Sequence, residues 1–259
     1  MIATSSNNWF VCPGAKPGVE TRLFLFPYAG SGPAAFGKWS AGLPDNIEVW
    51  IAHYPGRGSR HTEPPLRQVI TLTDKFAQAI QSLLDKPFAL FGHSLGGLVA
   101  FELARQLRKQ NLPGPQTLFI SACGAPQLLD PHPPIHTLPD REFLQALQEL
   151  KGMPVEVFNF PELIELLLPA LRADFEAVEN YQYPSDGLPL NCPIVAFGGL
   201  DDPRVSQERL EGWAMHTNAG FKSQFFPGDH FFIHGMKEAL LQSIAKEIII
   251  SAKRKHESV

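Results

Sequence analysis

The chain has 259 residues, 44% of them hydrophobic and 19% charged, which is the composition of an ordinary globular protein. Disordered, collagen-like and coiled-coil chains are therefore excluded. The 22 Lys and Arg residues against 26 Asp and Glu residues give a net charge of −4, so the basic footprint of a nucleic-acid-binding protein is missing.

The hydrophobic pattern predicts strands and helices in alternation along most of the chain. Short apolar runs predict strands over 23–26, 47–52, 88–91, 117–121, 193–197 and 222–226. Apolar residues that recur every three or four positions predict helices over 71–84, 98–108, 207–216 and 236–251. Gly198 and Gly199 are expected to form a turn, and no element is assigned before Arg22. Such alternation predicts an α/β fold in which helices cover both faces of a mostly parallel sheet.

A segment from about 125 to 184 breaks this alternation. Eight of the 24 prolines lie between Pro126 and Pro169, and the segment has helical patterns over 140–150 and 161–179 but no strand pattern. Because the segment is short and broken by proline, we interpret it as a helical insertion into a single domain of residues 1–259. It could simply pack extra helices on the sheet, but the residues that flank it favour a lid over a pocket.

The three cysteines, Cys12, Cys123 and Cys192, are odd in number and far apart. They predict neither a disulfide framework nor a Cys-x-x-Cys metal site. The first residues lack the pattern of a secretion leader, and no run approaches the ~18 consecutive apolar residues of a membrane span. The sequence therefore predicts a soluble, cytoplasmic protein.

The strongest chemical signal is Gly92-His93-Ser94-Leu95-Gly96, which matches the pattern Gly-x-Ser-x-Gly. The pattern alone arises easily by chance, but here a predicted buried strand precedes it and a predicted helix follows it. In that setting the serine lies on a strained turn that exposes its hydroxyl group, and the glycines let strand and helix approach closely. Ser94 is therefore the candidate nucleophile. A glycine-rich turn with a capping serine is the less favoured interpretation.

A serine hydroxyl group needs a base, and the base needs a carboxylate that orients it. In this architecture the acid follows the serine along the chain, and the histidine follows the acid. Asp201 and Asp202 both follow a predicted strand; we prefer Asp202, because a proline after it fixes the turn, and keep Asp201 as the alternative. His230 lies in a turn after the next predicted strand and is the candidate base. His234 is expected to begin the last helix.

Two backbone N–H groups are expected to bind the oxyanion that forms during acyl transfer. One belongs to Leu95, the residue after the nucleophile, and the other to Ala29, in the glycine-rich loop after the first predicted strand. A zinc site formed by His230 and His234 is the competing chemistry. It is disfavoured because His-Glu-x-x-His is absent and His230 is predicted on a loop. We therefore predict no metal site.

Five short motifs occur in the order of one family: Phe26-Pro27-Tyr28-Ala29-Gly30, Tyr54-Pro55-Gly56-Arg57-Gly58, Gly92-His93-Ser94-Leu95-Gly96-Gly97, Gly199-Leu200-Asp201-Asp202-Pro203 and Gly228-Asp229-His230-Phe231-Phe232. From about Arg22 to Ile248 the chain resembles type II thioesterases, the stand-alone editing hydrolases that accompany nonribosomal peptide and polyketide synthases. The resemblance implies an α/β-hydrolase fold with Ser94 as nucleophile, Asp202 as acid and His230 as base.

The resemblance also implies a substrate, an acyl or aminoacyl thioester on the phosphopantetheine arm of a carrier protein. Ser94 would attack the thioester carbonyl, His230 would accept its proton, and water would release the acyl group without a cofactor. Family members are commonly monomers, and neither a nucleic acid nor a membrane is an expected partner. The insertion would cover the acyl pocket, and five of its apolar residues are candidates either for lining that pocket or for packing helices together: Phe158, Phe160, Leu163, Leu166 and Leu167.

Two alternatives accompany this interpretation. A medium-chain acyl thioesterase of fatty-acid synthesis belongs to the same superfamily and would prefer medium-length over short acyl groups. A non-catalytic module that binds carrier proteins would keep the fold, but the intact set of Ser94, Asp202 and His230 argues against it.

Overall fold

The computed structural model describes residues 8–128, 130–149, 160–184 and 187–256. The strands are β1 (Phe10–Val11), β2 (Thr21–Phe26), β3 (Ile47–Ala52), β4 (Phe88–His93), β5 (Leu118–Ser121), β6 (Ile194–Gly199) and β7 (Phe221–Phe226). The α-helices are α1 (Val69–Ala79), α2 (Leu95–Lys109), α3 (Asp140–Glu149), α4 (Pro161–Glu179), α5 (Gln207–Glu211), α6 (Phe232–Gly235) and α7 (Lys237–His256). Short 3-10 helices cover Pro33–Phe36, Ser40–Gly42, Gly58–Arg60, Gln81–Leu83 and Gly212–His216.

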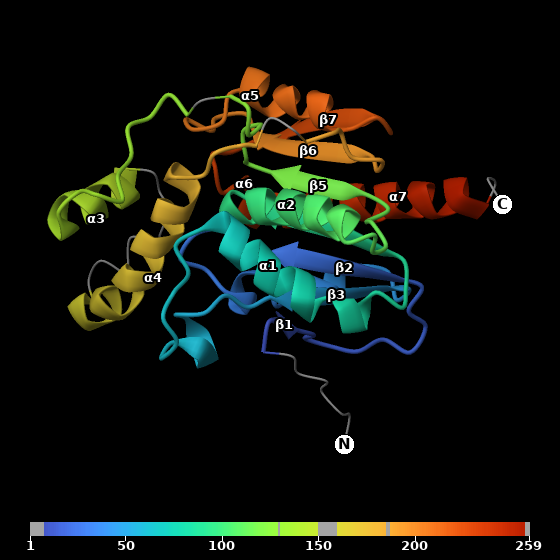
Figure 1. Ribbon diagram of the computed structural model, residues 1–259, viewed down its shortest axis with the longest axis horizontal. Coiled ribbons are helices and arrows are strands. Elements are labelled where there is room, and N and C mark those ends of the chain that lie inside the picture. The colour runs from blue at the N-terminus through green and yellow to red at the C-terminus, as the bar shows by residue number, and fades with distance from the viewer. Residues whose placement is uncertain (1–7, 129, 150–159, 185–186, 257–259) are drawn as a thin grey trace.

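The seven strands of the described residues form one sheet in the order β1-β3-β2-β4-β5-β6-β7. β1 runs antiparallel to β3, and every other neighbouring pair is parallel. Parallel strands that are covered on both faces need apolar side chains on both faces, which explains the continuous apolar runs in the sequence. The predicted α/β class, with helices on both faces of a mostly parallel sheet, is confirmed (Figure 1).

The side chains of β2 show how the two core layers are built. Phe24 and Phe26 pack with α1 and α2 on one face, whereas Leu23 and Leu25 pack with α7 on the other. All four side chains are fully buried. Each such burial contributes about 1.5–3 kcal/mol to stability. The central strands therefore give rigid support to the loops at their carboxyl ends.

The insertion contributes α3 and α4, which lie beyond one end of the sheet (Figure 1). β5 and β6, which flank the insertion in sequence, pair directly in the sheet, so the sheet continues across it. A small apolar cluster joins the two helices, with Phe143 and Leu147 from α3 and Leu171 from α4. Both helices match the predicted spans, although Leu150 at the predicted end of the first lies outside the described residues.

Several boundaries differ from the prediction. β1 was not predicted, because a strand of two residues is too short to show a hydrophobic pattern. The helix predicted over 71–84 starts earlier and ends at Ala79, and a 3-10 turn follows. The helix predicted over 207–216 is divided at Gly212, a poor helix former, into α5 and a 3-10 helix. His234 lies in the separate short helix α6 and does not begin the last helix.

Gly198 and Gly199 end β6 and do not form the predicted turn. They pair with residues of β7. A Cβ atom on Gly199 would lie 2.3 Å from the backbone oxygen of Asp229, so glycine is needed where the loop before His230 crosses the strand. The prediction was wrong because a glycine pair is typical both of turns and of close backbone approach. No helix among the described residues has the length and apolarity of a membrane span.

Candidate active site

Ser94 lies at the turn between β4 and α2 with a φ of +55° and a ψ of −118°. Residues with a Cβ atom rarely adopt this conformation, and it costs on the order of 1–3 kcal/mol. A Cβ atom on Gly92 would lie 1.9 Å from the backbone oxygen of Gly96, and one on Gly96 would lie 2.0 Å from that of Phe26. Neither glycine can be replaced without moving backbone. The tight packing of strand and helix thus holds the strained serine in place.

Asp202 and His230 come together from loops after neighbouring strands, β6 and β7. The Nδ1 atom of His230 lies 2.9 Å from Oδ2 of Asp202, whose side chain is fully buried. The other oxygen, Oδ1, accepts backbone N–H groups from Arg204 at 2.8 Å and Val205 at 3.2 Å. Both carboxylate oxygens are therefore held, and the carboxylate fixes the imidazole ring. Asp201, the alternative acid, is exposed.

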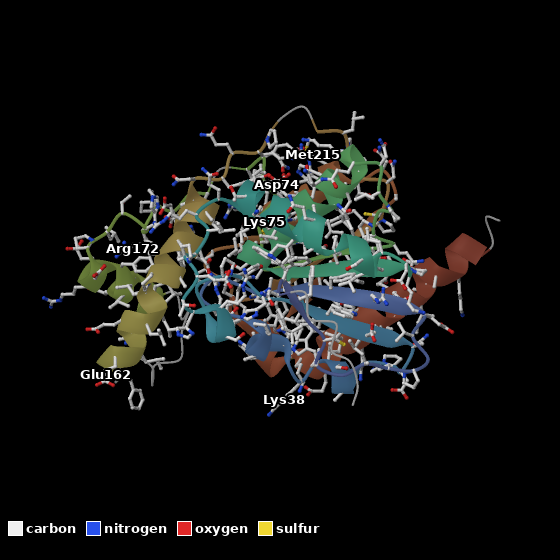
Figure 2. All side chains as sticks on the ribbon, turned by 60° about the horizontal axis from the view of Figure 1, so that its bottom comes forward. Lys38, Asp74, Lys75, Glu162, Arg172 and Met215 are labelled. Carbon is white, nitrogen blue, oxygen red and sulfur yellow. The ribbon has the colours of Figure 1, made fainter. Side chains whose placement is uncertain are left out.

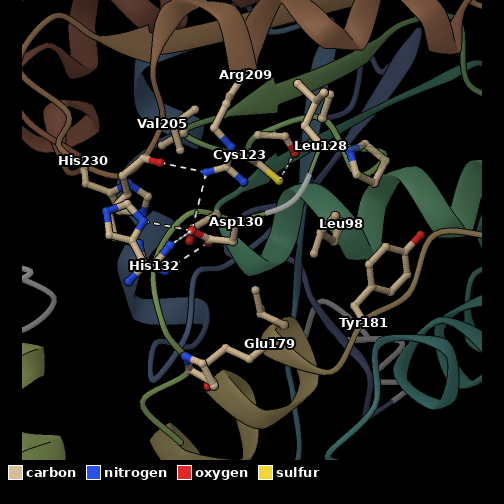
Figure 3. Close-up of a pocket in the computed structure, with 18 residues that line it drawn as sticks. Leu98, Cys123, Leu128, Asp130, His132, Glu179, Tyr181, Val205, Arg209 and His230 are labelled. Atoms are coloured by element: carbon tan, nitrogen blue, oxygen red, sulfur yellow. Dashed lines mark hydrogen bonds and ion pairs between the residues drawn. The ribbon is translucent and has the colours of Figure 1, made fainter.

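Ser94 and His230 share the walls of two neighbouring cavities. The larger, about 350 Å³, extends along the loop after β5 toward the loop before α5 (Figure 3). The smaller, about 70 Å³, reaches toward Ala29 and is mainly apolar, with Leu171 and Phe175 of α4 in its wall. An acyl thioester bound at Ser94 would therefore meet two different surroundings, one in which polar and apolar groups are mixed and one mainly apolar.

The wall of the larger cavity carries a charged cluster around Asp130 (Figure 3). The Asp130 carboxylate accepts the Nδ1 proton of His132 at 2.8 Å and pairs with Arg204 at 3.3 Å and Arg209 at 3.8 Å. Burial raises the pKa of Asp130, but the hydrogen bonds from His132 and the two guanidinium charges outweigh it, so the pKa lies below its usual value. This wall therefore offers fixed charges to a ligand, beside its apolar residues.

The two predicted oxyanion donors lie at the same site. Ala29 lines the smaller cavity beside Ser94, and Leu95 is the first residue of α2. Within the described residues neither backbone N–H donates a hydrogen bond. The next N–H group along the loop, that of Gly30, is already bound to a carboxylate oxygen of Asp174 at 2.7 Å. The loop therefore leaves the Ala29 N–H group available to a ligand.

The neighbouring histidines have packing roles. His93 is fully buried, its Nδ1 atom lies 2.9 Å from the Ser121 hydroxyl group, and burial lowers its pKa well below the usual value, with His230 and His234 adding to the effect. The ring of His234 packs on Tyr28, and the described residues hold no group of side chains suited to a metal ion.

The insertion contributes to the cavities through other residues than those proposed from the sequence. Phe160, Leu163 and Leu166 are exposed, Leu167 packs within the cluster between α3 and α4, and Phe158 lies outside the described residues. The wall is formed instead by three residues farther along α4: Leu171, Phe175 and Val178. α4 is apolar on most of its circumference in the first half, so the sequence alone did not indicate which face turns toward the site.

Two charged residues near the site, Arg57 of the second motif and Asp174 of α4, were given no role from the sequence alone. The guanidinium group of Arg57 and the carboxylate of Asp174 form a buried bidentate pair. Asp174 follows Leu171 by three residues and precedes Val178 by four, so it lies on the apolar stripe of α4. A carboxylate on such a stripe is a signal that could have indicated a buried partner.

Comparison with known proteins adds to this geometry. A family model described as "Thioesterase domain" matches residues 21–248. The chain belongs to the thioesterase family. The thioesterase is 41% identical over 242 residues to the gramicidin S biosynthesis protein GrsT of Aneurinibacillus migulanus, a match that covers 93% of this chain and 94% of that protein.

Two solved structures are similar to the thioesterase along most of both chains. The type II thioesterase BorB from the borrelidin biosynthetic cluster has a TM-score of 0.87 and 33% identity, over 94% of this chain and 99% of that one. The RedJ thioesterase from the prodiginine pathway of Streptomyces coelicolor has a TM-score of 0.84 and 35% identity, over 92% and 95%. The thioesterase is therefore a thioester hydrolase, and the predicted α/β-hydrolase fold and resemblance to type II thioesterases are confirmed.

Proposed function

We propose that Ser94 is the nucleophile, His230 its general base and Asp202 the carboxylate that orients the base. The observation that supports this most directly is the hydrogen bond between Asp202 and Nδ1 of His230, in a cavity that both His230 and Ser94 line. With Nδ1 engaged, Nε2 is the ring atom free to accept the proton of the Ser94 hydroxyl group. The strained backbone of Ser94 supports the same role, because such strain clusters at functional sites.

The reaction follows in two acyl-transfer steps. The Ser94 oxygen attacks the thioester carbonyl carbon while Nε2 of His230 takes the hydroxyl proton. The tetrahedral intermediate collapses, the carbon–sulfur bond breaks, and His230 returns the proton to the departing thiolate. A water molecule, deprotonated by the same nitrogen, then attacks the acyl-serine ester, and the carboxylic acid leaves as the Ser94 hydroxyl group is restored.

The backbone N–H groups of Ala29 and Leu95 are proposed to bind the oxyanion of both intermediates. Leu95 supports this role by its place at the first turn of α2, where the helix end carries partial positive charge. Loss of a single oxyanion donor in a serine hydrolase typically slows turnover by about 100- to 1000-fold. We therefore expect each of these two N–H groups to contribute about 100- to 1000-fold to the turnover rate.

The proposed substrate is an acyl or aminoacyl thioester on the phosphopantetheine arm of a carrier protein, and the proposed role is to clear misprimed or stalled synthase modules. Support comes from the type II thioesterases BorB and YbtT, the latter from the yersiniabactin biosynthetic pathway, which match this chain along nearly their whole length. The alternative, a medium-chain thioesterase of fatty-acid synthesis, is disfavoured by the charged cluster around Asp130, since a long alkyl chain gains nothing from fixed charges.

A substrate panel tests this proposal. Hydrolysis of acetyl, propionyl, aminoacyl and decanoyl groups is measured on pantetheine and on a carrier protein. We expect the short acyl and aminoacyl groups to be released at least as fast as the decanoyl group, and a higher kcat/KM on the carrier protein than on free pantetheine. A strong preference for the decanoyl group would favour the fatty-acid alternative.

A further inference from the structure

A buried ion pair joins the insertion to the body of the protein beside the oxyanion loop, residues 27–31. Nη1 and Nη2 of Arg57 donate to Oδ2 and Oδ1 of Asp174 at 2.6 and 2.8 Å. The two side chains are only 4% and 1% exposed. Burial opposes the positive charge of Arg57, but the Asp174 carboxylate outweighs it, so the pKa of Arg57 lies above its usual value. Arg57 therefore keeps its positive charge inside the protein.

The same two side chains also hold the backbone of the oxyanion loop. Oδ2 of Asp174 accepts the Gly30 N–H group at 2.7 Å, and Nη1 of Arg57 donates to the Ser31 carbonyl oxygen at 3.1 Å. Gly30 follows Ala29 directly, so these bonds fix the peptide plane next to the proposed oxyanion donor. The loop is thus oriented by a residue of α4, which lies 144 positions away in the sequence.

α4 and the oxyanion loop are also in close van der Waals contact, in addition to the polar contacts through Asp174. Gly30 has a φ of +74°, and a Cβ atom at that position would lie 2.2 Å from Cδ2 of Leu171. Leu171 precedes Asp174 by one turn of α4 and lines the smaller cavity. Any shift of this part of α4 therefore moves both the cavity wall and the carboxylate that holds the loop.

We propose that Arg57 and Asp174 are positioning residues that set the Ala29 N–H group for oxyanion binding, so that the oxyanion site is complete only while α4 is seated. This inference rests on the proposed role of Ala29. Neither side chain reaches the reacting atoms; both act through the backbone of Gly30 and Ser31. The insertion thereby takes part in rate enhancement as well as in covering the site.

The chemical consequence is an effect on turnover with little effect on substrate binding. An oxyanion donor binds the tetrahedral intermediate more strongly than the planar thioester, so its displacement lowers kcat while KM changes little. In enzymes generally, misplacement of a group by about 1 Å can cost about 100-fold in rate. A purely structural ion pair would instead lower the midpoint of thermal unfolding and leave kcat of the folded enzyme unchanged.

The test compares Asp174→Asn with a matched control, Glu48→Gln. Glu48 forms a largely buried pair with Arg22 at 3.2 Å, at the amino ends of β3 and β2 and so at the opposite end of the sheet from Ser94. Both variants change a carboxylate to an amide. For each we measure kcat, KM, the thermal midpoint, and the rate at which a small fluorophosphonate labels Ser94, a reaction that also develops charge at the oxyanion site.

For Asp174→Asn we expect kcat and the labelling rate to fall together by about 30- to 100-fold, with KM within threefold. Glu48→Gln is expected to lose thermal stability and to keep both rates within twofold. A folded Asp174→Asn enzyme with both rates within threefold of wild type would overturn the inference. If that variant does not fold, Arg57→Met/Asp174→Leu removes both buried charges, a type of exchange that proteins often tolerate, and is judged by the same criteria.

Failure of this inference can be told apart from failure of the proposed function. Full activity in Ser94→Ala would contradict the proposed function itself. Loss of activity in Ser94→Ala, together with unchanged rates in both ion-pair variants, would leave the proposed function intact and remove only the role of Arg57 and Asp174.

Discussion

The two walls of the active site are held in different ways. On the sheet side, Ser94, Asp202 and His230 lie after the carboxyl ends of parallel strands, and they are fixed by local backbone contacts and by the side-chain bond between Asp202 and His230. On the insertion side, α4 is held by a small apolar cluster with α3, by the packing of Ala177 in the main core and by polar contacts that include the buried ion pair between Arg57 and Asp174. The sheet side carries the reactive groups, whereas the insertion side shapes the cavity and, by our inference, adjusts the oxyanion loop.

This difference separates two kinds of substitution. Figure 2 shows the side chains on the ribbon, with Glu162 and Arg172 of α4 labelled at one end of the molecule. Changes to the reactive groups of the sheet side should abolish chemistry while stability is kept. Changes on α4 should alter rate or selectivity by smaller factors. Three substitutions test this division, in order of decreasing effect on activity, and a fourth tests the pH dependence of stability.

Ser94→Ala removes the proposed nucleophile and should give the largest effect. We expect kcat for an acyl-pantetheine to fall by about 10⁴-fold or more, as with removal of a triad member in other serine hydrolases. The midpoint of thermal unfolding should stay the same or rise, because the substitution removes only the hydroxyl group and leaves the strained backbone as it is. Steady-state kinetics and thermal unfolding of the same preparation check both statements. Activity within tenfold of wild type would contradict the mechanism.

Asp202→Asn should have the second largest effect, with Asp201→Asn as its matched control. An amide at position 202 can still accept the backbone N–H groups of Arg204 and Val205, but it no longer stabilises the imidazolium form of His230. We expect kcat to fall by about 10²- to 10⁴-fold in Asp202→Asn. Asp201 is exposed, so its variant should stay within threefold. A larger loss in Asp201→Asn would reverse the assignment of the acid.

The same division explains what could be predicted from the sequence. The turn at Ser94 is a local pattern, because the glycines that it needs lie within two residues of it. Asp202 and His230 could be proposed because parallel strands bring their carboxyl ends to one edge of the sheet. In each case a residue's place follows from its own strand.

The insertion side could not be predicted in this way. Which face of α4 turns toward the site depends on contacts with α3 and the oxyanion loop, and the apolar pattern around Leu163 and Leu166 did not distinguish that face from the others. The bond between Arg57 and Asp174 joins residues 117 positions apart, and no sequence spacing indicates such a pair. Only the packing of the helix on the loop brings them together.

The pH dependence of stability gives a third test, on the sheet side but away from the reactive groups. His216 is buried against the core, and burial lowers its pKa to about 4, with the charge of Arg105 as the second cause. Its unfolded pKa is near 6.5, so below that pH the unfolded chain binds a proton that the folded chain does not. Stability is therefore fully present above pH 6.5 and is lost as the pH falls toward 4, by up to about 3 kcal/mol.

Urea unfolding at pH 7.5 and pH 4.5 measures this loss in wild type, His216→Asn and the exposed-site control His61→Asn. The difference in unfolding free energy between the two pH values should be smaller in His216→Asn by about 1–3 kcal/mol than in the other two proteins. The comparison uses the pH difference of each protein, so a general loss of stability in His216→Asn does not affect it. Equal pH differences in all three would show that His216 does not contribute.

Phe175→Ala should give the smallest effect and the one most specific to the insertion side. The Phe175 ring forms part of the wall of the smaller cavity and packs edge-on against Phe143 of α3, with ring centroids 5.7 Å apart. Its truncation enlarges the apolar cavity without touching the groups on the sheet. Since one methylene in such a pocket is worth about 1–3 kcal/mol, kcat/KM for a butyryl or hexanoyl group should rise about tenfold relative to acetyl. Phe160→Ala, at an exposed position of the same insertion, should leave the acyl profile unchanged. If both variants kept the wild-type profile, α4 would not select the acyl group, and its contribution would be confined to the oxyanion loop.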